Sequence, residues 1–190
     1  MTEYIVIDLF CGLGGWSAGF VKHGYEAHGY DIVDFSRHYP GTFHQCDLTK
    51  YKECEFPERV DVLVSSSPCT EFTKMILPWR LRFKKIDLQS ALELFYLQFE
   101  IKDYLKPRYY VFENVYGATK YVNIPYSFKL GSRYFWTNVP PFQMPVAGDL
   151  YNKVSQYRHA GIDRSVWRAV IPQRISESFA LRIKDLLSKF

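Results

Sequence analysis

Hydrophobic positions along the first half of the chain form short β-branched runs separated by a segment with helical periodicity. Residues 4–9 and 60–65 are apolar runs typical of buried strands, and residues 26–30 look like a further strand that ends at Asp31. Residues 16–23 lie between the first two of these strand candidates along the chain. They have the pattern of a short helix that ends at Gly24. The first half therefore predicts alternating strands and helices.

The second half continues this alternation. The clearest helix extends from Asp87, a residue type favoured at the N-cap, to Lys106, and strands are expected at 109–112 and 134–136. A last helix begins near Pro172. The inward faces of the two helices consist of apolar residues at helical spacing: Leu88, Leu92, Phe95 and Phe99 in the first, and Ile175, Phe179, Ile183 and Leu186 in the last. Strands separated by helices predict an α/β fold with a doubly wound, mostly parallel sheet and helices on both faces, which is a Rossmann-like arrangement.

Length and composition are those of one globular domain spanning residues 1–190. The proline-rich span 140–145 is the one stretch that resembles a linker. A net charge of +4 permits nucleic-acid binding without requiring it, and the aromatic content of 18% is expected mainly in the core.

The four cysteines have no spacing typical of metal ligands, so no metal site is expected. No secretory signal is recognisable at the start, and no apolar run reaches the roughly 18 residues that a membrane span needs. We therefore expect reduced thiols and a cytoplasmic location without membrane attachment. Three of the cysteines are interpreted as packing residues: Cys11, Cys46 and Cys54.

A glycine turn and a series of aspartates suggest a ligand site. The turn, Asp8 to Gly15, follows the first strand and opens a helix, where glycines let a ligand approach the backbone. Asp31 ends the second strand, and Asp47 stands where a third strand should stop. A tight turn without a ligand and solvated aspartates are the alternatives for each feature alone. Three acidic strand ends in succession favour a nucleotide-like ligand.

A candidate nucleophile follows the strand at 60–65. Cys69, preceded by Pro68, stands at the strand exit, where a thiol can be partly exposed in an electropositive setting. A small buried packing residue is the alternative. Glu113 ends another buried strand, where partial burial would suit it for proton delivery.

In their order and spacing these segments resemble the motifs of the cytosine-C5 methyltransferase family. The resemblance rests on four segments: Asp8 to Gly15, Pro68-Cys69, Glu113-Asn114-Val115, and Ala169 to Pro172. Together they extend from one end of the chain to the other. The resemblance implies a class I methyltransferase fold, S-adenosylmethionine as cofactor and cytosine C5 in DNA as the methylated atom.

Residue by residue, the resemblance implies a cofactor site and a catalytic group. Asp31 would hold the ribose and Asp47 the adenine amino group. The remaining cofactor residues would be Phe10, Gly12, Leu13, Gly15, Leu48, Pro68, Ala169 and Val170. Cys69 would add to C6 of the cytosine, Glu113 would hold or protonate N3, and Arg133 would contact the base.

The sequence departs from the family pattern in three places. Of the Gln-x-Arg-x-Arg motif only Arg133 is present, with Lys129 and Gly131 at the other positions, and Ala169 replaces an asparagine. The stretch between Arg133 and Ala169 is far shorter than the family's target-recognition domain. We therefore expect a reduced or absent recognition region around 138–166, as in short phage or viral forms.

A basic stretch follows Cys69 and is a candidate DNA contact. It interleaves cations with an aromatic residue, a combination that binds phosphates and stacks on bases. Its members are Lys74, Trp79, Arg80, Arg82, Lys84 and Lys85. A solvated surface loop is the alternative.

Three readings of the function stay open. The first is an active DNA cytosine-C5 methyltransferase acting on double- or single-stranded DNA, with a possible protein partner that supplies specificity. The second is a degenerate relative that binds cofactor or nucleic acid without turnover. The third is an RNA cytosine-C5 methyltransferase, which shares the chemistry of the first.

Overall fold

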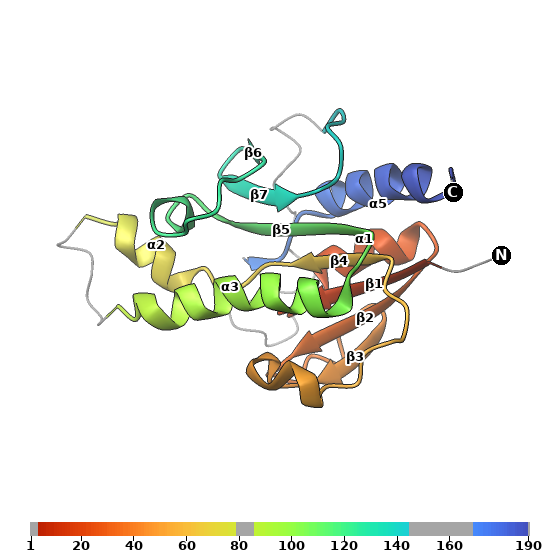
Figure 1. Ribbon diagram of the computed structural model, residues 1–190, viewed down its shortest axis with the longest axis horizontal. Helices are drawn as coiled ribbons and strands as arrows, with labels where there is room; N and C mark the ends of the chain where they lie inside the picture. Colours follow the sequence, from red (N-terminus) through yellow and green to blue (C-terminus); the bar gives the residue numbers. More distant parts are fainter. Residues whose placement is uncertain (1–3, 79–85, 145–168, 190) are drawn as a thin grey trace.

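The computed structural model describes residues 4–78, 86–144 and 169–189, and these form one seven-stranded sheet flanked by helices. Figure 1 shows the strands stacked in sheet order. In that order they are β3 (Thr42–Gln45), β2 (Tyr25–Asp31), β1 (Tyr4–Leu9), β4 (Val62–Ser65), β5 (Tyr109–Val115), β7 (Arg133–Thr137) and β6 (Phe128–Leu130). Neighbours from β3 to β5 are parallel, whereas β7 is antiparallel to both β5 and β6. The predicted mostly parallel α/β sheet is confirmed.

Helices cover both faces of this sheet. The helices α1 (Gly15–Lys22) and α5 (Gln173–Leu187) pack on one face, and α3 (Leu88–Leu105) packs on the other, in front of the strands in Figure 1. Three short elements each contribute a buried residue to the cluster on the α3 face: η1 (Leu48–Glu53), α2 (Thr70–Ile76) and η3 (Ala118–Lys120). The doubly wound arrangement is thus present as predicted.

Successive strand residues alternate between the two cores. Val6 and Phe135 belong to the cluster under α1 and α5, whereas their neighbours Ile7 and Trp136 belong to the cluster under α3. Because both faces are covered, these strands are apolar at consecutive positions, which is the pattern that predicted them.

The two long helices begin and end close to the predicted positions. Asp87 caps α3 by accepting a hydrogen bond from the Ser90 backbone N–H at 3.1 Å, and Pro172 directly precedes α5. The predicted inward residues are buried or partly buried against the two cores: Leu88, Leu92, Phe95, Phe99, Ile175, Phe179, Ile183 and Leu186. The short elements α2, η1, η3 and β6 were not expected, because three to seven residues show too little periodicity to be recognised.

The expectation of four reduced thiols is wrong for one pair. Cys46 and Cys54 form a disulfide, with their Cα atoms 6.2 Å apart. The turn through η1 reverses the chain and returns Cys54 to the end of β3, a proximity that eight residues of sequence separation do not reveal. Cys11 and Cys69 are free. None of the described helices combines the length and apolar composition needed to cross a bilayer.

Candidate active site at the carboxyl edge of the sheet

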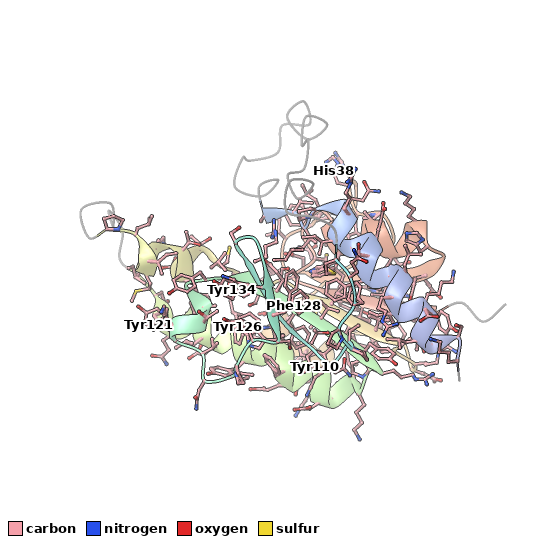
Figure 2. The ribbon with its side chains drawn as sticks, turned by 90° about the horizontal axis from the view of Figure 1, so that it is seen from above. His38, Tyr110, Tyr121, Tyr126, Phe128 and Tyr134 are labelled. Carbon is pink, nitrogen blue, oxygen red and sulfur yellow. A yellow bond between two sulfur atoms is a disulfide. The ribbon has the colours of Figure 1, made fainter. Side chains whose placement is uncertain are left out.

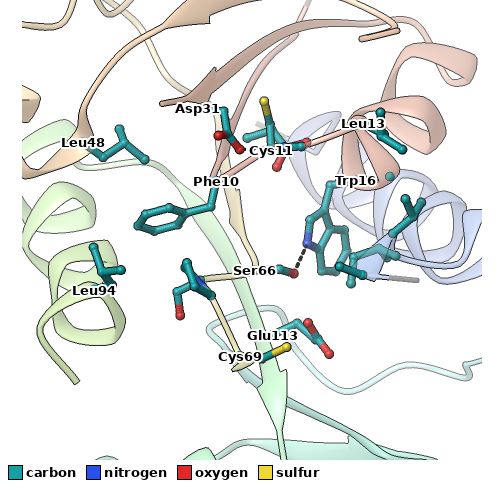
Figure 3. A pocket seen from close by; sticks show the side chains of 18 of the residues that line it. Phe10, Cys11, Leu13, Trp16, Asp31, Leu48, Ser66, Cys69, Leu94 and Glu113 are labelled. Carbon is teal, nitrogen blue, oxygen red and sulfur yellow. Dashed lines mark hydrogen bonds between the residues drawn. The ribbon is translucent and has the colours of Figure 1, made fainter. Parts of the chain in front are cut away.

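A cavity of about 610 Å³ opens where β1, β2, β4 and β5 end. Ligands of open α/β sheets bind at this edge. Every residue predicted for catalysis or cofactor binding lines this cavity: Phe10, Gly12, Leu13, Gly15, Asp31, Asp47, Leu48, Pro68, Cys69, Glu113, Arg133, Ala169 and Val170. Segments far apart in the sequence therefore meet in one space, part of which is drawn in Figure 3.

The glycine turn forms one wall of the cavity. Gly12 and Gly14 have φ angles of 48° and 74°, a left-handed conformation that glycine adopts without steric cost. A Cβ on Gly15 would lie 2.6 Å from the backbone nitrogen of Ile171, so only glycine lets the final segment approach α1 this closely. This contact brings Ala169 and Val170 to the cavity.

Two aspartates provide the polar groups of this wall. Asp31 accepts hydrogen bonds from the backbone N–H groups of Gly12 and Val33, each at 3.0 Å, and burial raises the pKa of its carboxyl. Asp47 is more exposed and caps η1, accepting from the Thr49 backbone at 3.0 Å. Hydrogen bonds from Thr49 lower the pKa of Asp47. Both carboxylates are thus fixed in position before any ligand binds.

Asp8 differs from the other two aspartates. Its side chain is 1% exposed, and it accepts hydrogen bonds from the Ser17 hydroxyl at 2.8 Å and the Ser17 backbone N–H at 3.3 Å. Burial raises its pKa to about 8. This carboxyl therefore ties β1 to α1 beneath the glycine turn.

The loop after β4 carries the candidate nucleophile. Asn114 fastens this loop to β5 by donating hydrogen bonds to the Ser67 carbonyl at 3.1 Å and the Ser67 hydroxyl at 3.0 Å. Cys69 follows at the N-terminal end of α2, partly exposed and facing the same region as Glu113 in Figure 3. The asparagine next to Glu113 therefore positions the segment that holds the thiol.

Glu113 and Arg133 form an ion pair beside Cys69. The Arg133 Nη1 donates to the Glu113 Oε1 at 3.0 Å across the antiparallel β5–β7 pair, and the Glu113 side chain is 7% exposed. Burial raises the Cys69 pKa, Glu113 raises it further and Arg133 partly opposes this. The prediction of an electropositive setting for Cys69 is therefore wrong, because burial and the Glu113 carboxylate raise its pKa by more than the Arg133 guanidinium lowers it.

Several lining residues were not predicted. The Trp16 indole donates a hydrogen bond to the Ser66 hydroxyl at 3.0 Å, linking α1 to the loop after β4 (Figure 3). Ile32 and Phe35, just after Asp31, also line the cavity, and Leu94 reaches it from α3. The position of Ile32 and Phe35 next to a predicted anchor is a signal that could have identified them, whereas Leu94 depends on helix placement.

The predicted DNA-binding stretch is described only at its start. Lys74 lies in α2 and pairs with Glu71, whose other carboxylate oxygen accepts from the Asp87 backbone at 3.0 Å. The other members lie outside the described residues: Trp79, Arg80, Arg82, Lys84 and Lys85. Lys74 does not line the cavity, and within the described part it pairs inside α2 with Glu71, the residue that links this helix to the start of α3.

Comparison with known proteins gives one curated relative and several solved structures. The Type II methyltransferase M.NgoPII of Neisseria gonorrhoeae is 31% identical over an alignment of 119 residues that covers 59% of this chain. The chain spans only 33% of the length of that relative. Among solved structures, a DNA modification methyltransferase encoded within an E. coli prophage has a TM-score of 0.42 at 22% identity, covering 61% of this chain and 33% of the other. The Entamoeba histolytica methyltransferase EhMeth has a TM-score of 0.48 at 16% identity, covering 87% and 62%.

A sequence profile is more decisive than these pairwise likenesses. The profile of C-5 cytosine-specific DNA methylases matches residues 4–124. The matched range contains the glycine turn, both aspartate anchors, the Cys69 loop and Glu113, all of which meet at the cavity. It covers more than half of the 190 residues, and the chain belongs to the C-5 cytosine-specific DNA methylase family.

Proposed function

We propose that this chain transfers a methyl group from S-adenosylmethionine to C5 of cytosine in DNA. The observation that carries the proposal is the single cavity in which the glycine turn and two aspartates meet a thiol and an ion pair of Glu113 with Arg133. The first set, the glycine turn and the two aspartates, suits a nucleoside cofactor. The second set, the Cys69 thiol and the ion pair, suits covalent chemistry on a base. Membership of the family supports both assignments.

The residues of the first set fit S-adenosylmethionine by their chemistry. A carboxylate offers about four acceptor sites, and Asp31 uses two of them on backbone N–H groups. Acceptor capacity therefore remains for ribose hydroxyls, and Asp47 can accept from the adenine amino group. Phe10 and Leu48 supply apolar walls, with the Phe10 ring directed toward the side where Leu48 and Leu94 lie in Figure 3. When bound, the cofactor supplies an activated methyl group.

Cys69 acts in the proposal as the nucleophile. Loss of the thiol proton to solvent gives a thiolate that adds to C6 of the cytosine and breaks the C5–C6 double bond. This addition makes C5 electron-rich, so that it can accept the methyl group. Loss of the C5 proton to solvent then allows the C6–S bond to break, which restores the aromatic ring and the thiolate.

Glu113 and Arg133 act on the other edge of the base. Glu113 holds or protonates N3, which draws charge away from the ring as the thiolate adds. Arg133 keeps the carboxylate in place through its 3.0 Å hydrogen bond and contacts the base. Such placement of an acid and its partner contributes typically about 10²- to 10⁴-fold to a rate.

The proposal also includes a reduced target-recognition region around 138–166. Of this range only residues 138–144 are described, and the remainder lies outside the described residues. The short span between β7 and Ala169 leaves few side chains to read base edges in the major groove. The isolated chain is therefore expected to show little sequence preference, and a partner protein would have to supply it.

Transfer of labelled methyl groups tests the proposal directly. Purified protein with labelled S-adenosylmethionine is expected to label cytosine C5 in single- or double-stranded DNA at many sequence contexts. Labelling of tRNA but not DNA would show that RNA is the substrate in place of DNA. Cofactor binding without any methyl transfer would favour a degenerate relative. Methylation confined to one short motif would contradict the reduced recognition region.

Cofactor affinity provides a second prediction. Asp31→Ala should weaken S-adenosylmethionine binding by about 10- to 100-fold, because a hydrogen bond to a charged group is worth about 1.5–3 kcal/mol. Asp47→Ala should have a smaller effect, because this carboxylate is more exposed. Calorimetry measures both. Asp34→Ala is the matched control, since Asp34 caps a turn through the Ser36 N–H at 2.9 Å and does not line the cavity. Unchanged affinity in the Asp31/Asp47 double variant would refute these anchors.

A further inference from the structure

Three exposed tyrosines gather in the segment that follows β5. Tyr116, Tyr121 and Tyr126 are 42%, 38% and 44% exposed. Tyr134 of β7 is nearly buried and lies between two of them, with ring centroids 5.7 Å from Tyr116 and 4.9 Å from Tyr126. Figure 2 shows Tyr126 beside Tyr134, with Tyr121 in the same part of the molecule. A buried tyrosine thus holds two exposed rings in place.

The segment that carries these rings also carries lysines, and it contains no carboxylate residue. The Lys120 ammonium lies over the Tyr116 ring, 4.8 Å from its centroid. Lys129 of β6 pairs with Tyr134 of β7, so both side chains emerge on the same face of the sheet. Residues 114–144 contain three cationic residues, Lys120, Lys129 and Arg133, and no aspartate or glutamate. We call Tyr116, Lys120, Tyr121, Tyr126, Lys129 and Tyr134 the tyrosine–lysine surface.

This surface adjoins the candidate active site. Val115 and Arg133, which stand opposite each other on β5 and β7, both line the cavity, and each directly precedes a tyrosine of the surface. The turn at Gly117 packs so closely on the Phe72 carbonyl of α2 that a Cβ would not fit. Tyr116 is therefore fixed beside the helix whose N-terminal end carries Cys69.

From these contacts we propose that the tyrosine–lysine surface binds the unpaired DNA strand that flanks the target cytosine. Tyrosine faces stack on bases of any sequence, and lysines neutralise the phosphates between them. A duplex hides its base faces, whereas a single strand exposes them. The inference rests on the proposed function for its substrate, and it adds that the chain prefers unpaired DNA at this surface.

Anisotropy of a labelled single-stranded oligonucleotide with one central cytosine tests the surface. Tyr116→Ala and Tyr126→Ala should each weaken binding by about 5- to 100-fold, because each removes one stacking ring. Tyr116→Phe and Tyr126→Phe keep the ring and should bind as the native protein does. Lys129→Gln should reduce the slope of log affinity against log salt by about 0.7. Tyr104→Ala is the matched control, since Tyr104 is 53% exposed near the C-terminal end of α3, away from this surface.

The outcomes separate this inference from the proposed function. Three results would each overturn the proposed role of the surface. They are native affinity for the single strand in both alanine variants, no binding of the native protein to the single strand, and a loss of affinity in the variants that is confined to duplex DNA. Tighter binding of RNA of the same sequence would overturn DNA as its ligand. Weakened strand binding in the alanine variants, with no methyl transfer by the native protein, would retain the surface and refute the methyltransferase. Cofactor affinity should be unchanged in the alanine variants, because neither tyrosine lines the cavity.

Discussion

Replacement of Cys69 by alanine is expected to reduce methyl transfer by at least about a thousandfold, because the variant cannot form the bond to C6. The side chain lies at the cavity and contributes little to the core, so the fold and cofactor affinity should be kept. Turnover of S-adenosylmethionine on DNA measures the first quantity, and calorimetry measures the second.

The same thiol should be trapped by DNA that contains 5-fluorocytosine. Fluorine at C5 cannot leave as a proton does, so elimination of the thiolate stalls and a covalent complex accumulates. This complex should require cofactor for full yield and should be absent in Cys69→Ser. Cys11→Ser is the control, because Cys11 is the other free cysteine that lines this cavity and trapping should not need it. A complex that survives Cys69→Ser would show that another thiol reacts, and normal turnover in that variant would rule out covalent catalysis.

Patterning predicted the elements of this fold wherever an element buries several apolar residues in a regular pattern. The strand that begins at Val62 is apolar at consecutive positions because Leu63 and Val64 face different cores. Helix α5 was predicted from Ile175, Phe179 and Ile183, which are all fully buried. The antiparallel direction of β7 could not be predicted, since direction depends on how the chain returns and not on which residues face the core.

The site was predicted to the extent that its residues lie in local motifs. Asp31 ends β2 and Cys69 lies in the loop that follows β4, and parallel strands bring their carboxyl ends to one edge. The electrostatic balance around Cys69 was not predictable, because it depends on burial and on the distance between Glu113 and Arg133 across two strands. The Cys46–Cys54 disulfide likewise depends on the turn made by η1, a short element without a clear sequence signal.

Glu113 and Arg133 should shift the Cys69 pKa in opposite directions. Variants of these two residues therefore separate the reactivity of the thiol from the rate of methyl transfer. Burial and Glu113 raise the Cys69 pKa above its ordinary value of 9.0, so the native thiol is almost entirely protonated at neutral pH. Because only the thiolate reacts, alkylation of native Cys69 should keep increasing as the pH rises beyond 9.0. Methyl transfer should also rise with pH through the neutral range, where thiolate formation favours addition to C6.

Glu113→Gln is expected to make Cys69 more reactive and the enzyme less active. Removal of the negative charge lowers the Cys69 pKa, so the alkylation profile should move to lower pH, while methyl transfer should fall by about 10²- to 10⁴-fold because the amide cannot protonate N3. Arg133→Gln should move the alkylation profile to higher pH, and Arg133→Lys, which keeps the charge, should leave it close to the native one. Rates of iodoacetamide modification at Cys69, followed by mass spectrometry across the pH range, give the profiles. A shift to higher pH in Glu113→Gln, or full activity in that variant, would contradict the role assigned to this carboxylate.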